Sequence, residues 1–331
     1  MIISTIGSHS ALQILFGAKQ EGLNTKIYCL KGRQKIYESF SVAKHIVLLD
    51  SYEELLEMQP ETNEIFIPHG TLIAMLDEKV TEVSLPIFGN RKSMLWEMKR
   101  NKNHQLLEKA GIRTPYSYEI DEINRLSIVK FPGAKGGEGY FLCSSSAEYE
   151  KKLTALIKQG KIKEEEASGA QIQEYITGVT MYPHYFHSII YDRVEMLGID
   201  RRYETNADAL GRLSQENTDI ALSYKVVGNQ PLIIRESLLP TIIEYGEKVL
   251  SASRELFHPG LIGPYCIELA LTPDEIIAFE FTSRIVAGTS LYVSGSPYSK
   301  ILFNEEMSMA RRIAREIKMA MGQKRLDELI S

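Results

Sequence analysis

Cysteine, tryptophan and long apolar runs are all scarce in this sequence. Its 331 residues include one tryptophan and three cysteines, Cys29, Cys143 and Cys266, each of which has apolar neighbours. We expect buried thiols in a reducing compartment, and no cysteine spacing typical of zinc sites is present. Nowhere do about eighteen apolar residues stand together, as a membrane-spanning helix requires, and the first ten residues lack the positive segment of a signal peptide. We therefore expect a cytoplasmic protein with no membrane contact.

An excess of positive charge is also missing. The chain has 38 Lys and Arg against 43 Asp and Glu, a net charge of −5 and a pI near 5.9. This balance argues against a general affinity for nucleic acid, although one local basic pocket is still allowed. Hydrophobic residues make up 44% of the sequence, which at this length suffices for two or three packed layers.

The segment Val129–Phe141 has the composition of a phosphate-binding hairpin. A strand ending in Lys130 gives way to a loop with four glycines and Lys135, and a second strand follows. Glycines such as Gly136 and Gly137 let backbone N–H groups approach an anion closely, and the two lysines would supply charge. No Gly-Lys-Ser/Thr follows, so this is not a Walker A loop. The alternative is an exposed hairpin whose glycines serve only the turn.

The first third of the chain predicts a parallel βαβ unit. Ile2–Ile6 is expected to be a strand, Ala11–Gln20 a helix and Lys26–Leu30 the next strand. Anions bind at such strand-to-helix turns in parallel sheets, because free N–H groups face them there. The first turn contains the three polar residues Ser8, His9 and Ser10, although either serine could be only a helix cap.

A second turn of the same kind is expected at Thr71, between a strand at 64–68 and a helix at 72–76. Two polar turns at one sheet edge would form a pocket. We expect a last strand and turn at 86–91, where Arg91 is either within reach of a phosphate or, as the default, solvated. One helix is expected over 96–110.

Polar residues concentrate again in the middle of the chain. After paired strands at 182–186 and 194–198, we expect a polar loop at 199–206 containing Arg201, Arg202 and Glu204. The arginines form either a surface ion-pair cluster of little energetic value or a phosphate site. We favour the phosphate site because Asn229 is expected at another polar turn, before a helix that starts near Arg235.

Two apolar strands late in the chain each contain one glutamate. Glu268 and Glu280 are separated by a turn at 271–275, so the strands should pair antiparallel with the carboxylates facing. Like charges on buried strands need neutralisation, and magnesium fits because it takes few carboxylates and completes its shell with water and phosphates. The alternative is an edge hairpin whose glutamates point to solvent. If the glutamates hold magnesium, Arg284, four residues after Glu280, would face the transferring phosphoryl group.

Taken together, these motifs resemble the ATP-grasp superfamily. GSHSALQI at 7–14, PHGT at 68–71, FGNR at 88–91, MLGIDRRYETN at 196–206, VVGN at 226–229, RIVAGTS at 284–290 and GSPYSK at 295–300 resemble, more narrowly, the archaeal formate-dependent phosphoribosylaminoimidazolecarboxamide (AICAR) ligases. The resemblance implies ATP, formate and AICAR as substrates with Mg²⁺ or Mn²⁺. It implies AICAR contacts from His9, Thr71 and Asn229. It implies ATP contacts from Lys130, Glu204 and the run Glu174, Tyr175 and Ile176, where the adenine edge would bind the backbone.

The resemblance also implies an α/β chain made of α+β halves, the ATP-grasp fold preceded by a parallel βαβ domain. We expect domains at 1–95, 96–190 and 191–331 and a possible homo-oligomer. One departure from the family pattern is Glu138 in the glycine-rich loop between Lys130 and Phe141, where the family has arginine. Two rival functions follow: an ATP-grasp carboxylate–amine ligase with another acceptor, and a nucleotide-binding paralogue without catalysis.

Overall fold

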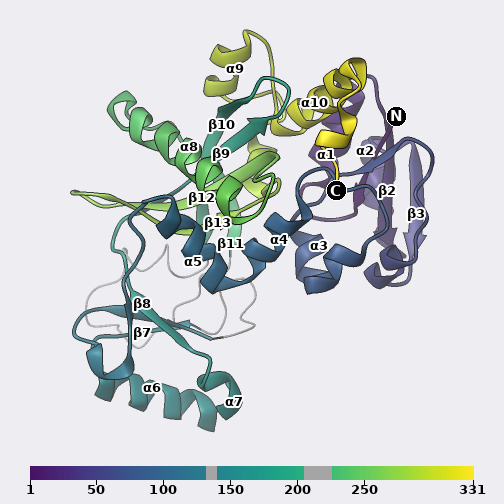
Figure 1. Cartoon of the computed structure of the whole chain (residues 1–331). Helices are drawn as coiled ribbons and strands as arrows, with labels where there is room; N and C mark the ends of the chain where they lie inside the picture. The colour runs from purple at the N-terminus through teal and green to yellow at the C-terminus, as the bar shows by residue number, and fades with distance from the viewer. Residues whose placement is uncertain (132–139, 205–225) are drawn as a thin grey trace.

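The computed structural model describes residues 1–131, 140–204 and 226–331, which contain three sheets (Figure 1). The amino-terminal elements are β1 (Ile2–Ile6), α1 (Ala11–Gln20), β2 (Asn24–Leu30), α2 (Lys35–Phe40), β3 (His45–Leu49), β4 (Glu64–Phe66) and α3 (Gly70–Leu76), followed by α4 (Arg91–Met98) and α5 (Arg100–Lys109). A small region contains β5 (Ser117–Tyr118), β6 (Ser127–Lys130), β7 (Tyr140–Cys143), α6 (Ser146–Lys158), α7 (Glu164–Ala167) and β8 (Gln171–Glu174). The large region contains β9 (Val179–Ser188), β10 (Arg193–Glu204), β11 (Val226–Pro231), α8 (Leu239–Leu256), β12 (Gly263–Leu271), β13 (Ile276–Thr282), α9 (Pro297–Phe303) and α10 (Met309–Gln323).

The amino-terminal sheet is parallel, with strand order β3-β2-β1-β4. Ile3 and Ile6 of β1 are fully buried, and the polar Thr5 between them donates its hydroxyl proton to the Ile67 carbonyl at 2.8 Å. That bond satisfies a hydroxyl that would otherwise be costly to bury. The predicted βαβ unit is confirmed, and β1 ends at the turn that carries His9.

The small sheet has the order β5-β8-β6-β7 and holds the two strands that flank the glycine-rich segment. Its β6 and β7 pair antiparallel with Lys130 opposite Tyr140, as predicted. Val129 and Ile172 pack into a separate apolar core under α6. The glycine segment itself, with Lys135, Gly136, Gly137 and Glu138, lies outside the described residues.

The large sheet is antiparallel, in the order β11-β10-β9-β12-β13, and α8 and α5 cover it with a shared apolar core (Figure 1). Because β9 and β10 are adjacent strands of this one sheet, the sheet includes residues on both sides of the expected boundary at 190. We propose instead that the large region begins at Val179, where β9 starts. In this sheet Glu268 of β12 lies opposite Glu280 of β13.

Two expected loops are strands in the structure. Residues 199–204 continue β10, where Arg202 pairs with Asn229 of β11, so the expected polar loop and the expected polar turn at Asn229 were wrong. Strands are recognised in sequence by alternating apolar residues, and that alternation is missing here because polar side chains such as Arg202 and Asn229 face the candidate site. The helix expected near Arg235 begins instead at Leu239, after a short 3₁₀ turn.

The region between the amino-terminal sheet and the small sheet also differs from expectation. The single helix expected over 96–110 is two helices, α4 and α5, broken at Lys99, whose backbone is extended. The expected strand at 86–91 is reduced to two isolated bridges, one from Ile87 to Phe66 and one from Phe88 to Ile330. Arg91 begins α4 and donates to the carbonyls of Thr81, Val83, Leu85 and Ser331, so its guanidinium fastens the chain and is neither solvated nor free for a phosphate.

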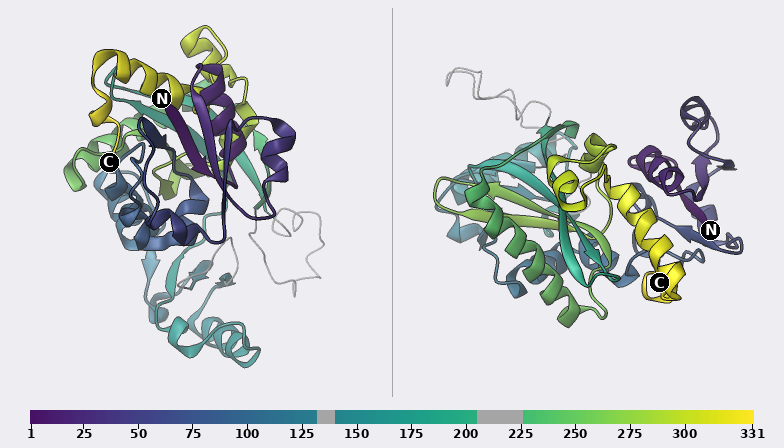
Figure 2. Two further views of the ribbon diagram at one scale, coloured as in Figure 1. Left: turned by 90° about the vertical axis from the view of Figure 1, so that its right-hand side faces the viewer. Right: turned by 90° about the horizontal axis from the view of Figure 1, so that it is seen from above.

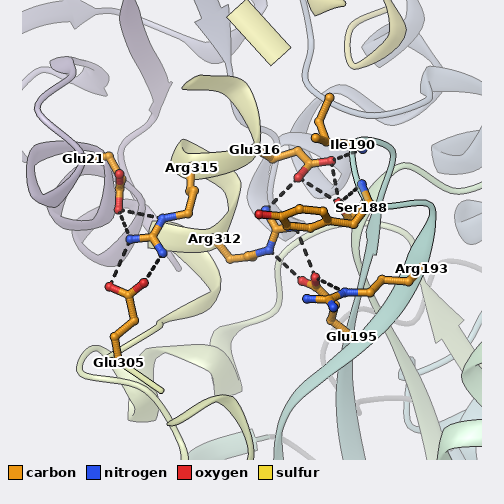
Figure 3. Close-up of polar contacts among 10 residues, drawn as sticks. Glu21, Ser188, Ile190, Arg193, Glu195, Glu305, Arg312, Arg315 and Glu316 are labelled. Atoms are coloured by element: carbon orange, nitrogen blue, oxygen red, sulfur yellow. Dashed lines mark hydrogen bonds and ion pairs between the residues drawn. The ribbon is translucent and has the colours of Figure 1, made fainter. Parts of the chain in front are cut away.

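The carboxyl-terminal helix α10 lies between the large sheet and the amino-terminal domain (Figure 2). A Cβ on Gly17 of α1 would come within 2.4 Å of the Arg311 backbone nitrogen, so glycine permits the close approach of the two helices. Buried Arg312 lies between Glu195 and Glu316, and Arg315 lies between Glu21 and Glu305 (Figure 3). These ion pairs join α10 to the large sheet on one side and to the end of α1 on the other.

The three cysteines are all buried and form no disulfide. Across the ranges the structure describes, none of the helices combines the length and the apolar character needed to cross a bilayer.

Candidate active site

Two histidines meet where β1 and β4 end. His69 is fully buried and stacks against His9, with ring centroids 5.4 Å apart and planes 9° from parallel. The Thr71 backbone N–H donates to His69 Nδ1 at 3.3 Å, so Nδ1 is the acceptor and Nε2 carries the proton toward the Ile6 carbonyl, 3.0 Å away. Burial lowers the pKa of His69 to about 4, which keeps the ring neutral. The buried His69 ring thus supports one face of the His9 ring.

His9 itself has a left-handed backbone, with φ of 47°, and an exposed side chain. Its Nδ1 lies 2.8 Å from the hydroxyl of buried Ser10, which occupies the N-cap position of α1 without making a side-chain cap bond. The pKa of His9 is lowered by partial desolvation and by the positive charges of Arg284 and Arg202. His9 therefore presents a neutral Nε2 near two arginines.

Arg284 follows β13 and reaches the same turn. A Cβ on Gly70 would lie 3.2 Å from the Arg284 guanidinium and 3.4 Å from His9 Nε2, so the three residues converge. Glu97 of α4 pairs with Arg284 at 2.7 Å through one carboxylate oxygen. The other oxygen accepts the backbone N–H of Ser283 at 2.8 Å and its hydroxyl at 3.2 Å. Glu97 was not anticipated from the sequence, where no motif surrounds it.

A buried aspartate holds Asn229. Asp200 is 1% exposed, accepts from Asn229 Nδ2 at 2.6 Å and lies 2.7 Å from His184 Nε2. A Cβ on Gly288 would come within 2.2 Å of the Asp200 carboxylate, so only glycine fits there. Sequence reasoning assigned no role to Asp200 or to His184, whose side chains meet only in the folded chain.

The next side chains along the site are Arg202 and the two glutamates. Arg202 pairs with Glu268 at 2.7 Å and lies over the Tyr182 ring, 3.8 Å from its centroid. Glu268 is 5% exposed, whereas Glu280, on the edge strand β13, is exposed. Desolvation and the Glu268 carboxylate raise the pKa of Glu280. The alternative prediction placed both glutamates on an edge hairpin, pointing to solvent. Glu280 does lie on an edge strand of the described sheet, but Glu268 is buried and paired with Arg202.

The donor set fits a divalent cation. In the described part of the chain no three His, Cys, Asp or Glu side chains gather as a ligand cluster, but Mg²⁺ takes only one or two carboxylates when phosphates complete its shell. Glu268 and Glu280 face each other across the hairpin, and only Glu268 has a direct ion pair, with Arg202, among the described residues. The pair could therefore offer carboxylate oxygens to such an ion.

Lys130 completes the site from the small sheet. Its Nζ donates to Gln173 Oε1 at 3.0 Å. Burial lowers the pKa of Lys130, Arg100 adds to that effect, and Glu280 and Glu268 oppose it. Lys130 therefore interacts electrostatically with both glutamates and with Arg100, at the start of α5, a cation that sequence reasoning missed.

The expected adenine-binding segment is engaged within the protein. Glu174 accepts from Arg113 at 2.6 Å and from the Tyr116 N–H at 3.3 Å, and the Tyr175 N–H donates to the Leu126 carbonyl. The Glu174 carboxylate thus braces the segment. Three further residues were expected to contact the substrates. Ser8 lies in the first turn, Arg201 of β10 is the backbone partner of Gln230 on β11, and Glu204 is the last residue of β10.

These groups act on one another electrostatically. Arg202 lowers the pKa of both His9 and Glu280, and Glu280 raises that of Lys130. They are candidates for one site to which the parallel sheet, the large sheet and the small sheet each contribute.

Solved structures define the class of this protein. Its fold is shared with an N5-carboxyaminoimidazole ribonucleotide synthetase in its ADP complex, with a TM-score of 0.66, 15% identity, and coverage of 95% of this chain and 76% of the other. It is shared more closely with the IMP biosynthesis protein PurP from Thermococcus kodakaraensis, with a TM-score of 0.81, 32% identity, and coverage of 99% and 100%. The predicted fold class is confirmed: the chain is an ATP-grasp enzyme of the ligase class.

Sequence relatives define the family. Residues 3–118 match the model "Protein of unknown function (DUF1246)" and residues 148–331 match "Domain of unknown function (DUF1297)". The 5-formaminoimidazole-4-carboxamide-1-(beta)-D-ribofuranosyl 5'-monophosphate synthetase of Archaeoglobus fulgidus is 46% identical, covering 99% of this chain and 94% of the relative. The synthetase of Sulfurisphaera tokodaii is 44% identical over the whole of both chains. The chain belongs to this synthetase family, as the sequence motifs predicted.

Proposed function

We propose that this protein formylates AICAR with formate and ATP, releasing ADP and phosphate, in the synthesis of purine nucleotides. One observation carries the proposal. Glu268 faces Glu280 and pairs with Arg202, whose charge also acts on His9, while both glutamates act on Lys130 of the small sheet. A metal–phosphate centre flanked by a nucleotide side and an acceptor side is what an ATP-dependent ligase requires.

The acceptor side is assigned to the turns of the parallel sheet. His9, Thr71 and Asn229 would contact AICAR, with Ser8 and Ser10 at the same turn and Arg201 and Arg202 as cations beside it. His69 and Asp200 act through others, since His69 stacks on His9 and Asp200 holds the Asn229 amide. These positioned side chains would fix the amine of AICAR toward the glutamate pair.

The nucleotide side is assigned to the small sheet and the end of β10. Lys130, Lys135 and the backbone of Gly136 and Gly137 would hold the phosphates, and Tyr175 and Ile176, braced by Glu174, would line the adenine. Glu204 would contact the ribose side. A magnesium or manganese ion, held by Glu268 and Glu280, would neutralise charge on the phosphates when bound.

The reaction balances without a protein nucleophile. A formate oxygen attacks the γ-phosphorus, the bond to the β,γ-bridging oxygen breaks, and ADP leaves with that electron pair. The AICAR amine then attacks the carbon of formyl phosphate, the bond from that carbon to the phosphate oxygen breaks, and the amine proton is lost as phosphate departs. The chain contributes orientation, cationic side chains and exclusion of water.

Omitting substrates one at a time tests the proposal. Phosphate release from Mg·ATP should require both formate and AICAR, and formylated AICAR (FAICAR) should form in an amount equal to the phosphate. Release that needs formate but is indifferent to AICAR would identify a ligase with another acceptor. ATP binding without release under any combination would identify a non-catalytic paralogue. Either result would reject the proposed function.

A further inference from the structure

Arg284 lies at the turn that carries Gly70, near His9, and the role expected for it from the sequence is to face the transferring phosphoryl group. We propose that Arg284, oriented by Glu97, binds the carboxylate of formate. This inference rests on the proposed function. It replaces the expectation that Arg284 faces the transferring phosphoryl group with a more specific role, because the structure places its guanidinium beside the acceptor turn.

Glu97 fixes the guanidinium in one orientation. The Glu97 carboxylate is 6% exposed and the Arg284 side chain 14% exposed, so their 2.7 Å ion pair is shielded from solvent. The second Glu97 oxygen accepts both donors of Ser283, the residue before Arg284. The Glu97 carboxylate of α4 thereby binds two consecutive residues, Ser283 and Arg284, just after β13. Because both of its oxygens are engaged, the carboxylate has little freedom to rotate.

The guanidinium retains unused donors. Arginine has five N–H groups. Among the described residues, Arg284 uses one nitrogen on Glu97 and another in a long 3.4 Å bond to the Ile285 carbonyl, while Nε has no partner. Gly70 faces this group, and because it has no Cβ the guanidinium and His9 Nε2 can approach the same point. A planar fork with free donors is the natural partner of a carboxylate.

Charge and position favour a small monoanion at this point. Glu97 offsets part of the Arg284 charge, so the guanidinium attracts the dianionic 5'-phosphate of AICAR less strongly than an unpaired arginine would. Arg284 follows the glutamate Glu280 by four residues and lies against His9. Formate must stand between the γ-phosphate and the acceptor amine, because its oxygen attacks the first and its carbon is attacked by the second.

The test compares Arg284→Lys and Glu97→Gln with the matched carboxylate-to-amide control Glu78→Gln, which removes only an exposed ion pair with Lys99. The KM for each substrate is measured with the other two saturating, after thermal melts show that each variant is folded. Losing a charged hydrogen bond is worth roughly tenfold to a hundredfold in affinity. We expect the KM for formate to rise by about that factor in Arg284→Lys and by a smaller factor in Glu97→Gln, with the KM values for ATP and AICAR within about threefold of wild type.

A second measurement does not depend on a folded variant. Nitrate is a planar monoanion like formate, and in the wild-type protein it should inhibit competitively against formate but not against AICAR. A raised KM for AICAR alone would assign Arg284 to the acceptor phosphate, and a fall in kcat alone would assign it to phosphoryl transfer. Either result, or nitrate competing with AICAR, overturns the inference while leaving the proposed function intact. Loss of formate dependence in the wild type would instead reject the proposed function itself.

Discussion

Glu268 on β12 and Glu280 on β13 lie directly opposite each other across adjacent antiparallel strands, and Arg202 pairs with the first of them at 2.7 Å. Lys130 also acts electrostatically on both carboxylates from the small sheet. A bound divalent ion would add to these cations in neutralising the pair together with the phosphates, which would link the strand register to phosphoryl chemistry.

Replacing the exposed member of the pair should abolish turnover without unfolding the protein. Glu280→Gln removes a ligand charge while leaving the Arg202–Glu268 ion pair, so we expect the rate of ADP formation to fall by at least about a hundredfold. Asp274→Asn, in the exposed turn of the same hairpin, is the control. Rates measured over a magnesium titration decide the matter, and a variant with wild-type rate and metal dependence would remove Glu280 from the metal site.

Lys130→Met should weaken ATP binding. The Lys130 ammonium is partly shielded from solvent, so its charge is only partly screened, and we expect at least a tenfold higher dissociation constant for ATP. Binding is measured by the shift in melting temperature with ATP concentration. Lys152→Met, which removes an exposed i,i+4 pair with Glu148, provides the comparison. Equal ATP affinity in the two variants would show that Lys130 does not contact the nucleotide.

Stability should fall with acidification because of His69. Its folded pKa of about 4 lies below the unfolded value of 6.5, so the unfolded chain binds the proton first as the pH falls. The folded state loses about 1.4 kcal/mol per pH unit between these values, or roughly 3 kcal/mol in all. Urea denaturation at pH 7 and pH 5 measures the loss. His69→Gln should lose less stability over that interval than the wild type, and an unchanged slope would show that His69 is protonated in the fold.

The buried ion pairs of α10 should matter far more than exposed ones. Arg312→Met leaves buried Glu316 without its ion pair and leaves Glu195 with only the half-exposed Arg193, and breaking such a buried network costs about 3–5 kcal/mol. Arg325→Ala removes an exposed pair with Glu328 and should cost under about 1 kcal/mol. Denaturant midpoints compare the two. Equal losses would mean that the Arg312 network is not what fastens α10.

Local pattern was enough to predict much of this fold. The strand and helix of the first βαβ unit, the strands around the glycine segment and the facing register of Glu268 and Glu280 are as expected from alternation and turn chemistry. These elements bury one face or end at strong turn signals, so neighbouring residues determine them. The family resemblance then supplied the fold class.

The errors share a physical cause. Residues 199–204 and Asn229 were taken for polar turns, although their strands pair with each other and turn polar side chains into the site. Glu97 was missed because its partners, Ser283 and Arg284, are almost two hundred residues away in sequence. Tertiary contacts of this kind leave no local pattern, and only the folded chain brings such residues together.

The most direct test of the account is to follow oxygen from formate. With ¹⁸O-labelled formate, ATP and AICAR, one formate oxygen becomes the bridge of formyl phosphate and leaves with the phosphate when the amine attacks the carbon. We predict phosphate carrying one ¹⁸O atom per turnover, detected by mass spectrometry or ³¹P NMR. Phosphate without label, formed together with FAICAR, would contradict activation of formate by ATP at this site.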